Sequence, residues 1–303
     1  MKAAVGAPSV PRLLREGVAR LEGAGPPTAR QDAEWLLATV LGVERFHLYL
    51  EPGRAIDGAA ADRYRALVER RAGHEPLQHL LGFEDFRGLR LAVSPNALIP
   101  RPETEGLVGW AVELLLRRPA AVVADVGTGS GAIACALASE LPRATILAVD
   151  ASTAALAVAA VNVRALGLSA RVKLVAGDLL APFGRRPPLD MIVANLPYLP
   201  SAVVPTLPAE VSRFEPRLAL DGGPDGLQVI RRLVAAAPAA LGPGGFLLME
   251  IGEDQAGPLS SLMAAEGFSD IAARRDLHAV ERYIAGRLPG GEAADAPARR
   301  VTC

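Results

Sequence analysis

The chain has 303 residues, of which half are hydrophobic and 21% are charged, a composition typical of a globular protein and not of a disordered one. The net charge of −1 excludes a strong overall basic field, so nucleic acid is not expected as the substrate. The longest uncharged run, residues 233–249, contains prolines and glycines, and we therefore expect no membrane span. Cys135 and Cys303 form neither a CxxC pair nor a zinc motif, which favours a reducing, cytoplasmic setting without a metal.

The first part of the chain shows helical spacing and no strand pattern before residue 83. Apolar residues recur at helical intervals in 10–21 and again in 35–41. Loosely alternating apolar residues around Gly88 then predict a hairpin, and prolines mark a connector after it. We expect a helical domain at 9–82, followed by a hairpin and connector at 83–102.

After a predicted helix at about 103–118, strands and helices alternate along the chain. The predicted strands are 121–124, 145–149, 172–175, 191–194 and 246–251. The predicted helices between them include 132–141 and 152–166. Such alternation is typical of an α/β fold in which helices cover both faces of a parallel sheet. We expect this domain to span 103–288, with a flexible tail at 289–303.

A glycine-rich loop, DVGTGSGA at 125–132, lies between a predicted strand and a predicted helix. Its candidate ligand-binding residues are Gly127, Thr128, Gly129, Ser130 and Gly131. Glycines allow a sharp turn and close approach to a ligand, and the helix that follows offers free N–H groups. Asp150 stands nineteen residues past Gly131, at the end of the next strand, where a carboxylate can accept both hydroxyls of a ribose. The pattern fits NAD as well as S-adenosylmethionine, and the alternative is a turn without a ligand.

The end of the third strand carries a further candidate pair, Asp178 and Leu179, in VAGDLL. Taken alone, Asp178 is best interpreted as a helix N-cap. Together with the glycine loop and Asp150 it falls beyond the carboxyl ends of parallel strands, where ligands collect, and could bind an adenine amino group. Leu179 could pack on the adenine face or in the core.

Asn195, Leu196, Pro197 and Tyr198 form the motif NLPY directly after the strand 191–194. Asn195 offers a carbonyl acceptor and two N–H donors. Pro197 favours an extended backbone at Leu196, so that the Leu196 carbonyl can lie beside the Asn195 oxygen. Two neighbouring acceptors match an NH₂ group, and Tyr198 adds a flat apolar wall. The motif therefore predicts a site for a planar amide or an exocyclic amine that needs no titratable base; the alternative is a strand-ending turn built by prolines.

Six segments occur in an order that resembles the HemK/PrmC methyltransferases: DVGTGSGAIACALA, AVDAS, GDLL, NLPY, RFEPRLALDGGPDGL and LLMEIG. Residues 75–105 are similar to the linker hairpin of that family, so the resemblance covers roughly 10–287. It implies a Rossmann-like seven-stranded class I methyltransferase domain, preceded by a small helical domain that recognises the substrate and by a β-hairpin linker. The implied reaction transfers a methyl group from S-adenosylmethionine to the side-chain amide nitrogen (N5) of the glutamine in the GGQ motif of class I peptide chain release factors.

The resemblance also implies roles by matching position. Gly127 to Gly131 would hold the methionine part of the cofactor and Asp150 its ribose. Asp178 and Leu179 would border the adenine, and Asn195 to Tyr198 would hold the substrate amide, with Asn195 also next to the cofactor.

Two residues depart from the family pattern. Leu196 stands where the family usually has proline, although its carbonyl keeps the acceptor, and Leu179 stands where an aromatic residue is frequent. NLPY also occurs in rRNA adenine dimethyltransferases, so a nucleic-acid adenine N6 is an alternative substrate. A ribosomal protein L3 glutamine is a second alternative, with the same chemistry and a different partner. An NAD-dependent dehydrogenase and a binding module without turnover are further alternatives. Glu103 and Glu105 are interpreted as helix-start carboxylates or as acids that position the substrate.

Overall fold

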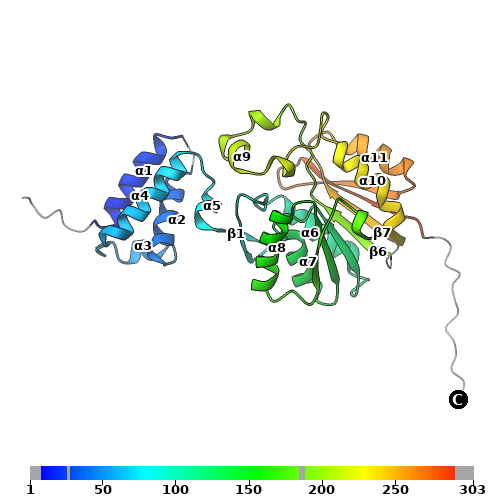
Figure 1. Ribbon diagram of the computed structural model, residues 1–303, viewed down its shortest axis with the longest axis horizontal. Coiled ribbons are helices and arrows are strands. Elements are labelled where there is room, and N and C mark those ends of the chain that lie inside the picture. The colour runs from blue at the N-terminus through cyan, green and yellow to red at the C-terminus, as the bar shows by residue number, and fades with distance from the viewer. Residues whose placement is uncertain (1–7, 26–27, 184–187, 291–303) are drawn as a thin grey trace, which may run out of the picture. The chain divides into compact units, whose positions relative to one another are not determined.

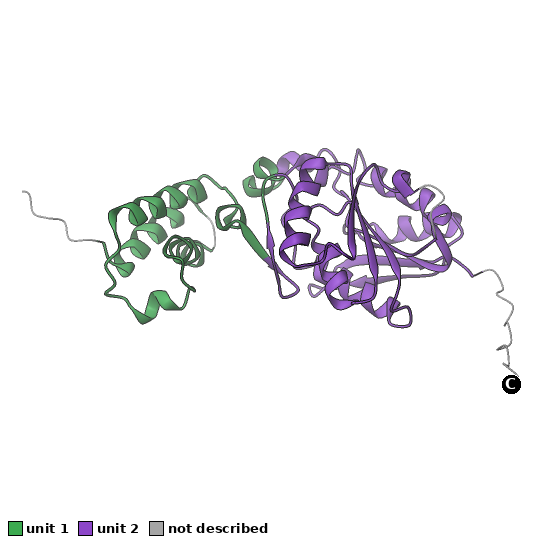
Figure 2. Ribbon diagram, turned by 60° about the horizontal axis from the view of Figure 1, so that its bottom comes forward, with its two compact units in different colours: residues 1–84, 93–95, 207–215 green, residues 85–92, 96–206, 216–303 purple. Residues whose placement is uncertain are grey.

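The computed structural model describes residues 8–25, 28–183 and 188–290. The chain divides into two compact units (Figure 2). The helical unit comprises 1–84, 93–95 and 207–215, and the sheet unit comprises 85–92, 96–206 and 216–303. In the described ranges, none of the helices has the length and apolar character needed to cross a membrane. Apart from Pro289 and Gly290, the predicted flexible tail lies outside the described residues.

The helical unit is built from short helices around a core of leucines and alanines. Its helices are α1 (Val10–Glu22), α2 (Ala29–Leu41), α3 (His47–Leu50), α4 (Gly58–Ala72), α5 (Leu77–Leu81) and α9 (Ala209–Phe214) (Figure 1). α4 begins where the Asp57 side chain accepts a hydrogen bond from the Ala60 N–H. Gly17 lets α1 approach α4, because a Cβ at this position would lie 1.9 Å from the hydroxyl of the buried Tyr64.

A buried arginine connects three segments of the helical unit. The Arg71 guanidinium donates to Asp32 Oδ2 at 2.6 Å, to Glu210 Oε1 at 2.9 Å and to the Glu75 carbonyl at 3.1 Å. Arg71 and Asp32 are both buried, whereas the Glu210 side chain is 38% exposed. The Arg71–Glu210 ion pair therefore joins the segment 207–215, which nothing in the sequence assigns to the helical region, to α4.

The sheet unit contains a mixed seven-stranded sheet with the strand order β5-β4-β3-β6-β7-β9-β8. The strands are β3 (Val122–Val126), β4 (Thr145–Asp150), β5 (Val172–Ala176), β6 (Leu189–Ala194), β7 (Leu241–Glu250), β8 (Ser269–Arg275) and β9 (Glu281–Arg287). β3 to β7 run parallel, whereas β9 is antiparallel to both β7 and β8, which corrects the expectation of an all-parallel sheet. The strand order reverses direction at β3, which creates a crevice at the carboxyl ends of β3 and its neighbours.

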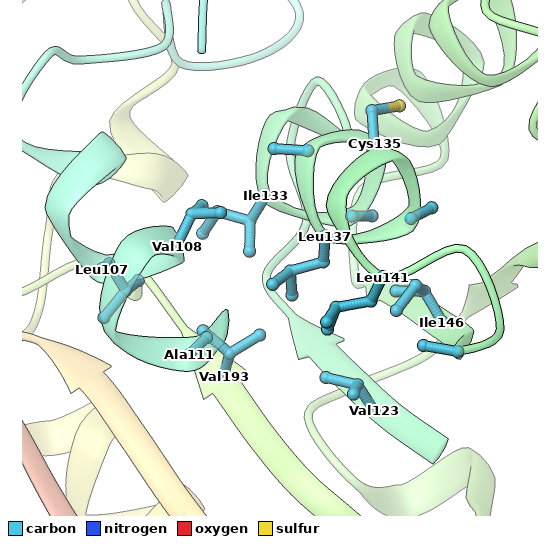
Figure 3. Close-up of a cluster of buried hydrophobic side chains, with 14 of the residues drawn as sticks. Leu107, Val108, Ala111, Val123, Ile133, Cys135, Leu137, Leu141, Ile146 and Val193 are labelled. Atoms are coloured by element: carbon cyan, nitrogen blue, oxygen red, sulfur yellow. The ribbon is translucent and has the colours of Figure 1, made fainter. Parts of the chain in front are cut away.

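Helices cover both faces of this sheet, which confirms the α/β fold class. They are α6 (Thr104–Leu115), α7 (Ala132–Glu140), α8 (Thr153–Ala165), α10 (Gln228–Ala240) and α11 (Ala256–Ala265). Val123 and Val193 pack with residues of α6 and α7 on one face (Figure 3). Their neighbours Ala124 and Ile192 pack with residues of α10 and α11 on the other. Because both faces are buried, the central strands are apolar at nearly every position.

A hairpin of β1 (Phe83–Phe86) and β2 (Leu89–Ala92) precedes the sheet, as predicted. Arg87 and Gly88 form its turn with φ angles of +48° and +74°, the signature of a tight hairpin turn. Glu105 Oε1 accepts a hydrogen bond from the Arg87 N–H at 2.9 Å, so this carboxylate holds the turn of the hairpin. Short 3₁₀ helices lie at Ala181–Phe183, Val204–Thr206 and Arg217–Ala219.

Candidate active site

A cavity in the sheet unit lies at the carboxyl ends of the parallel strands, where the strand order reverses. Four segments at strand ends contribute to its lining: 127–130 after β3, 149–152 at the end of β4, 177–179 after β5 and 195–197 after β6. The connector 96–101 and Thr104 complete one side. Most of the residues predicted from the sequence as ligand-binding therefore meet in one place, although Gly131 and Tyr198 are absent from the described lining.

The glycine loop packs directly against the NLPY motif. Gly127 has a φ of +75°, and a Cβ at this position would lie 2.9 Å from Leu196 Cδ2. Thr128 also lines the cavity, and its hydroxyl donates to Asp125 Oδ2 at 2.6 Å. Asp125 Oδ2 also accepts from the Ala134 N–H, and burial raises the pKa of Asp125 to about 7. Asp125 thereby ties the loop to the start of α7.

Asp150 connects the end of β4 to the same loop. Its Oδ2 accepts a hydrogen bond from the Gly129 N–H and its Oδ1 accepts one from the Ser152 N–H, both at 2.8 Å. Each carboxylate oxygen has a second lone pair, so Asp150 keeps acceptor capacity for a ligand at the cavity wall.

Asp178 and Leu179 follow β5 and lie beside Arg232, which no sequence motif predicted as part of the site. Arg232 of α10 forms an ion pair with Asp178, and both residues line the cavity. Leu179 has a φ of +50°, a conformation that residues other than glycine rarely adopt. Backbone strain of this kind is frequent at ligand sites. No local sequence signal distinguishes Arg232 from the neighbouring Arg231.

The polar side chains of NLPY are hydrogen-bonded to two residues, Thr104 and Glu250, that no sequence motif predicted as part of the site. Asn195 Nδ2 donates to Thr104 Oγ1 at 3.1 Å, and the Thr104 hydroxyl donates to Glu250 Oε2 at 2.7 Å. The Tyr198 hydroxyl points to the other oxygen, Glu250 Oε1, at 3.4 Å. One signal could have revealed Glu250, since it is a single carboxylate at the end of the apolar run FLLMEIG.

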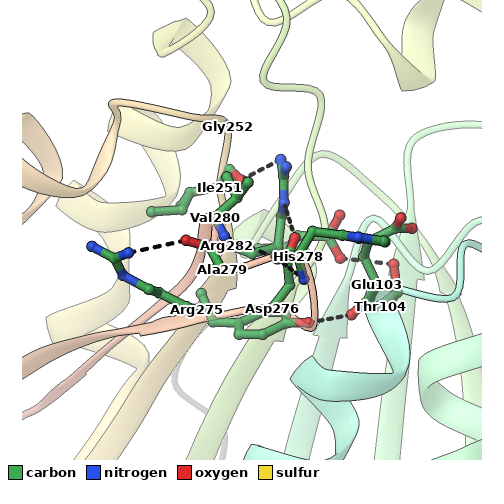
Figure 4. A network of polar contacts seen from close by, with 12 residues as sticks. Glu103, Thr104, Ile251, Gly252, Arg275, Asp276, His278, Ala279, Val280 and Arg282 are labelled. Carbon is green, nitrogen blue, oxygen red and sulfur yellow. Dashed lines mark hydrogen bonds and ion pairs between the residues drawn. The ribbon is translucent and has the colours of Figure 1, made fainter.

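Glu250 is 2% exposed, and burial raises its pKa to about 6. Burial likewise raises the pKa of Tyr198 to about 12, so its phenol stays a hydrogen-bond donor at neutral pH. Thr104 lies at the start of α6, and Arg282 lies on β9 between Asp276 and the Ile251 carbonyl (Figure 4). Elements at the carboxyl edge of the sheet thus converge on the end of β7.

The fold is that of a methyltransferase. Residues 111–205 match the family model described as "Methyltransferase small domain", and residues 12–82 match "PrmC N-terminal domain". The solved structure of the hMettl16 catalytic domain superimposes with a TM-score of 0.57 at 18% identity, over 76% of this chain and 84% of that one. At this identity the likeness concerns the fold alone.

Closer relatives define the family. The release factor glutamine methyltransferase of Moorella thermoacetica is 48% identical over 84% of this chain and 90% of its own length. The protein of the same name from Deinococcus radiodurans is 44% identical over 92% of this chain and 98% of its own length. The chain therefore belongs to the release factor glutamine methyltransferase family.

Proposed function

We propose that the protein transfers a methyl group from S-adenosylmethionine to the side-chain amide nitrogen (N5) of the glutamine in the GGQ motif of class I peptide chain release factors. Support comes from the names of its relatives and, above all, from Asn195, an amide presented at the cavity wall and held by Thr104. In this proposal, residues 9–82 recognise the protein substrate and 103–288 carry the reaction.

The residues of the cavity fit S-adenosylmethionine. Asp150 supplies acceptors for the ribose hydroxyls, and the apolar side chains of Leu179 and Val229 offer a surface for the adenine. A side chain at position 127 would have to displace Leu196, because its Cβ would lie 2.9 Å from Leu196 Cδ2. When bound, this cofactor supplies an electrophilic methyl group on a sulfonium, so that the chain need not supply a strong base.

Asn195 Oδ1 and the Leu196 carbonyl are proposed to accept the two hydrogens of the substrate amide. These bonds would orient the glutamine nitrogen for methylation. The bound cofactor would supply the methyl group and leave as the demethylated thioether, and the nitrogen would release one N–H proton to solvent after the transfer. Positioning of the two reactants is proposed to supply most of the catalysis, since an amide nitrogen is a weak nucleophile in solution.

The proposal is tested by incubating the protein with S-adenosylmethionine and a class I release factor, followed by peptide mass spectrometry. One added methyl on the GGQ glutamine is expected, and none on the release factor with Gln→Ala at that position. Ribosomal protein L3 and adenine-containing RNA serve as the competing substrates. Methylation of either one, with an unmodified release factor, would reject the proposed substrate.

Asp150→Asn is expected to weaken cofactor binding about tenfold or more. An asparagine in this place turns an NH₂ group toward either the Gly129 or the Ser152 N–H, so one loop hydrogen bond is replaced by a donor–donor contact. Titration calorimetry with S-adenosylmethionine measures the change. The matched control is Asp254→Asn, which removes the same charge from an exposed position and should bind the cofactor as the unmodified protein does.

A further inference from the structure

A single buried carboxylate holds both polar side chains of the NLPY motif. Glu250 Oε2 accepts from the Thr104 hydroxyl, whose oxygen accepts from Asn195 Nδ2, and Glu250 Oε1 faces the Tyr198 hydroxyl. Glu250 does not line the cavity in the described residues, so it reaches the site only through these neighbours.

The order of donors in this chain of hydrogen bonds is set by chemistry. A threonine hydroxyl has one hydrogen, and an ionised carboxylate can only accept. Thr104 must therefore give its hydrogen to Glu250 and present a lone pair to Asn195. The Asn195 NH₂ group donates to this lone pair, which leaves Oδ1 as the acceptor available to a ligand.

We propose that Glu250, acting through the Thr104 hydroxyl, is a positioning residue that fixes the orientation of the Asn195 amide so that Oδ1 is offered to the substrate NH₂ group. The inference rests on the proposed function for its catalytic consequence, but the orientation itself is a property of the free protein. A neutral residue 250 can donate to Thr104, which lets the hydroxyl hydrogen turn toward Asn195 and favours the flipped amide.

Burial and the charges around Glu250 set its pKa, and therefore the pH range in which it is ionised and the Asn195 amide is fixed. Burial is the main cause that raises the pKa of Glu250 to about 6, and Glu103 adds to it. The Thr104 and Tyr198 hydrogen bonds and the charge of Arg282 on β9 act in the opposite direction. Tyr283 beside Arg282 stays neutral, because burial and Glu250 raise its pKa to about 12. The ionised form, and with it the fixed amide, therefore predominates above about pH 6 and is lost as the pH falls below it.

Side-chain NMR of the free protein tests the orientation directly, because the chain has only three asparagines, Asn96, Asn162 and Asn195. Selective ¹⁵N-asparagine labelling gives three NH₂ pairs, and Asn195→Ala identifies the one of interest. We expect the Asn195 pair to move with a midpoint near pH 6, while the Asn162 pair, held by the Ala92 and Ser130 carbonyls, stays still. Thr104→Val should abolish the movement although Glu250 is still present, and Thr104→Ser should keep it. An Asn195 pair that does not titrate, or that titrates unchanged in Thr104→Val, would overturn the proposal.

Kinetics with the release factor test the consequence. Glu250→Gln and Thr104→Val should each lower kcat about 10- to 100-fold, the effect of a mispositioned reacting group, and leave the cofactor Kd within about twofold. The kcat of the double variant should not fall below that of the less active single variant, because both substitutions act on the same hydrogen bond. The decrease of kcat below pH 6 should be absent in Glu250→Gln. Glu253→Gln, an exposed glutamate three residues away, is the control and should be unaffected.

Failure of the proposed function and failure of the positioning role give different experimental results. An unmethylated release factor would reject the proposed function and leave the NMR result to decide the orientation. Full kcat in Glu250→Gln, together with normal methylation by the unmodified protein, would reject the positioning role alone. Glu250→Gln should fold, since burial already favours a neutral group at this position.

Discussion

Asn195→Ala is expected to lower methyl transfer to the release factor by about 10³-fold, the loss caused by removing a preorganised polar group from a reacting centre. The side chain lies at the cavity wall directly after β6, and its amide is held at 3.1 Å by Thr104. Without it, the substrate NH₂ group keeps only the proposed Leu196 carbonyl as a partner. The amide then rotates about that single bond, and the nitrogen no longer points steadily at the methyl group.

The same variant should still bind the cofactor and should remain folded. Thr104 keeps its bond to Glu250 when Asn195 is shortened, so the stability lost should be about 1 kcal/mol, as for one hydrogen bond. Single-turnover kinetics separate the chemical step from binding, and calorimetry gives the cofactor Kd. Asn195→Asp is the more specific variant, because it keeps the size of the side chain and an acceptor oxygen but loses the Nδ2 donor of the hydrogen bond to Thr104. Activity within tenfold of the unmodified protein in either variant would contradict the assigned role.

Local patterns predicted most of the elements that build the cavity. Strands buried on both faces are recognisable as short apolar runs between glycines and prolines, and β3 to β6 were predicted within a few residues. Most of the predicted ligand residues at their ends lie together because parallel strands bring their carboxyl ends to one edge. β8 and β9 were not predicted individually, since β8 carries exposed charged residues and shows little apolar alternation.

Long-range contacts account for what the sequence could not indicate. Thr104 and Glu250 are 146 residues apart, and no spacing rule connects a helix start to a distant strand end. The sequence offers Glu103 and Glu105 as candidate positioning acids. In the structure, Thr104 between them lines the cavity, and Glu105 binds the turn of the hairpin. Nothing local reveals the positive φ of Leu179, because backbone strain is imposed by the packing around it.

Arg71→Met is expected to lower the free energy of unfolding of the helical unit by about 3–5 kcal/mol. Arg71 and Asp32 are both buried and lie 2.6 Å apart, so removing the arginine leaves a carboxylate without its counter-charge in the interior. The Glu210 side chain, being 38% exposed, can turn to water and should contribute less. Fluorescence of Trp35 on α2 reports unfolding of this unit in urea, in a Trp110→Phe background that silences the other tryptophan.

The neighbouring Arg70 supplies the matched control. Its ion pair with Glu75 is half exposed on the arginine side, and Arg70→Met should cost less than about 1 kcal/mol. The double variant Arg71→Met, Asp32→Leu removes both buried charges and should regain most of the lost stability, because an apolar pair has no desolvation penalty. Equal effects of the two arginine substitutions would show that burial of the pair is not what makes Arg71 important. If the double variant stays as unstable as Arg71→Met, the hydrogen bonds from Arg71 to Glu75 and Glu210 hold the unit together, and the charge of Asp32 does not.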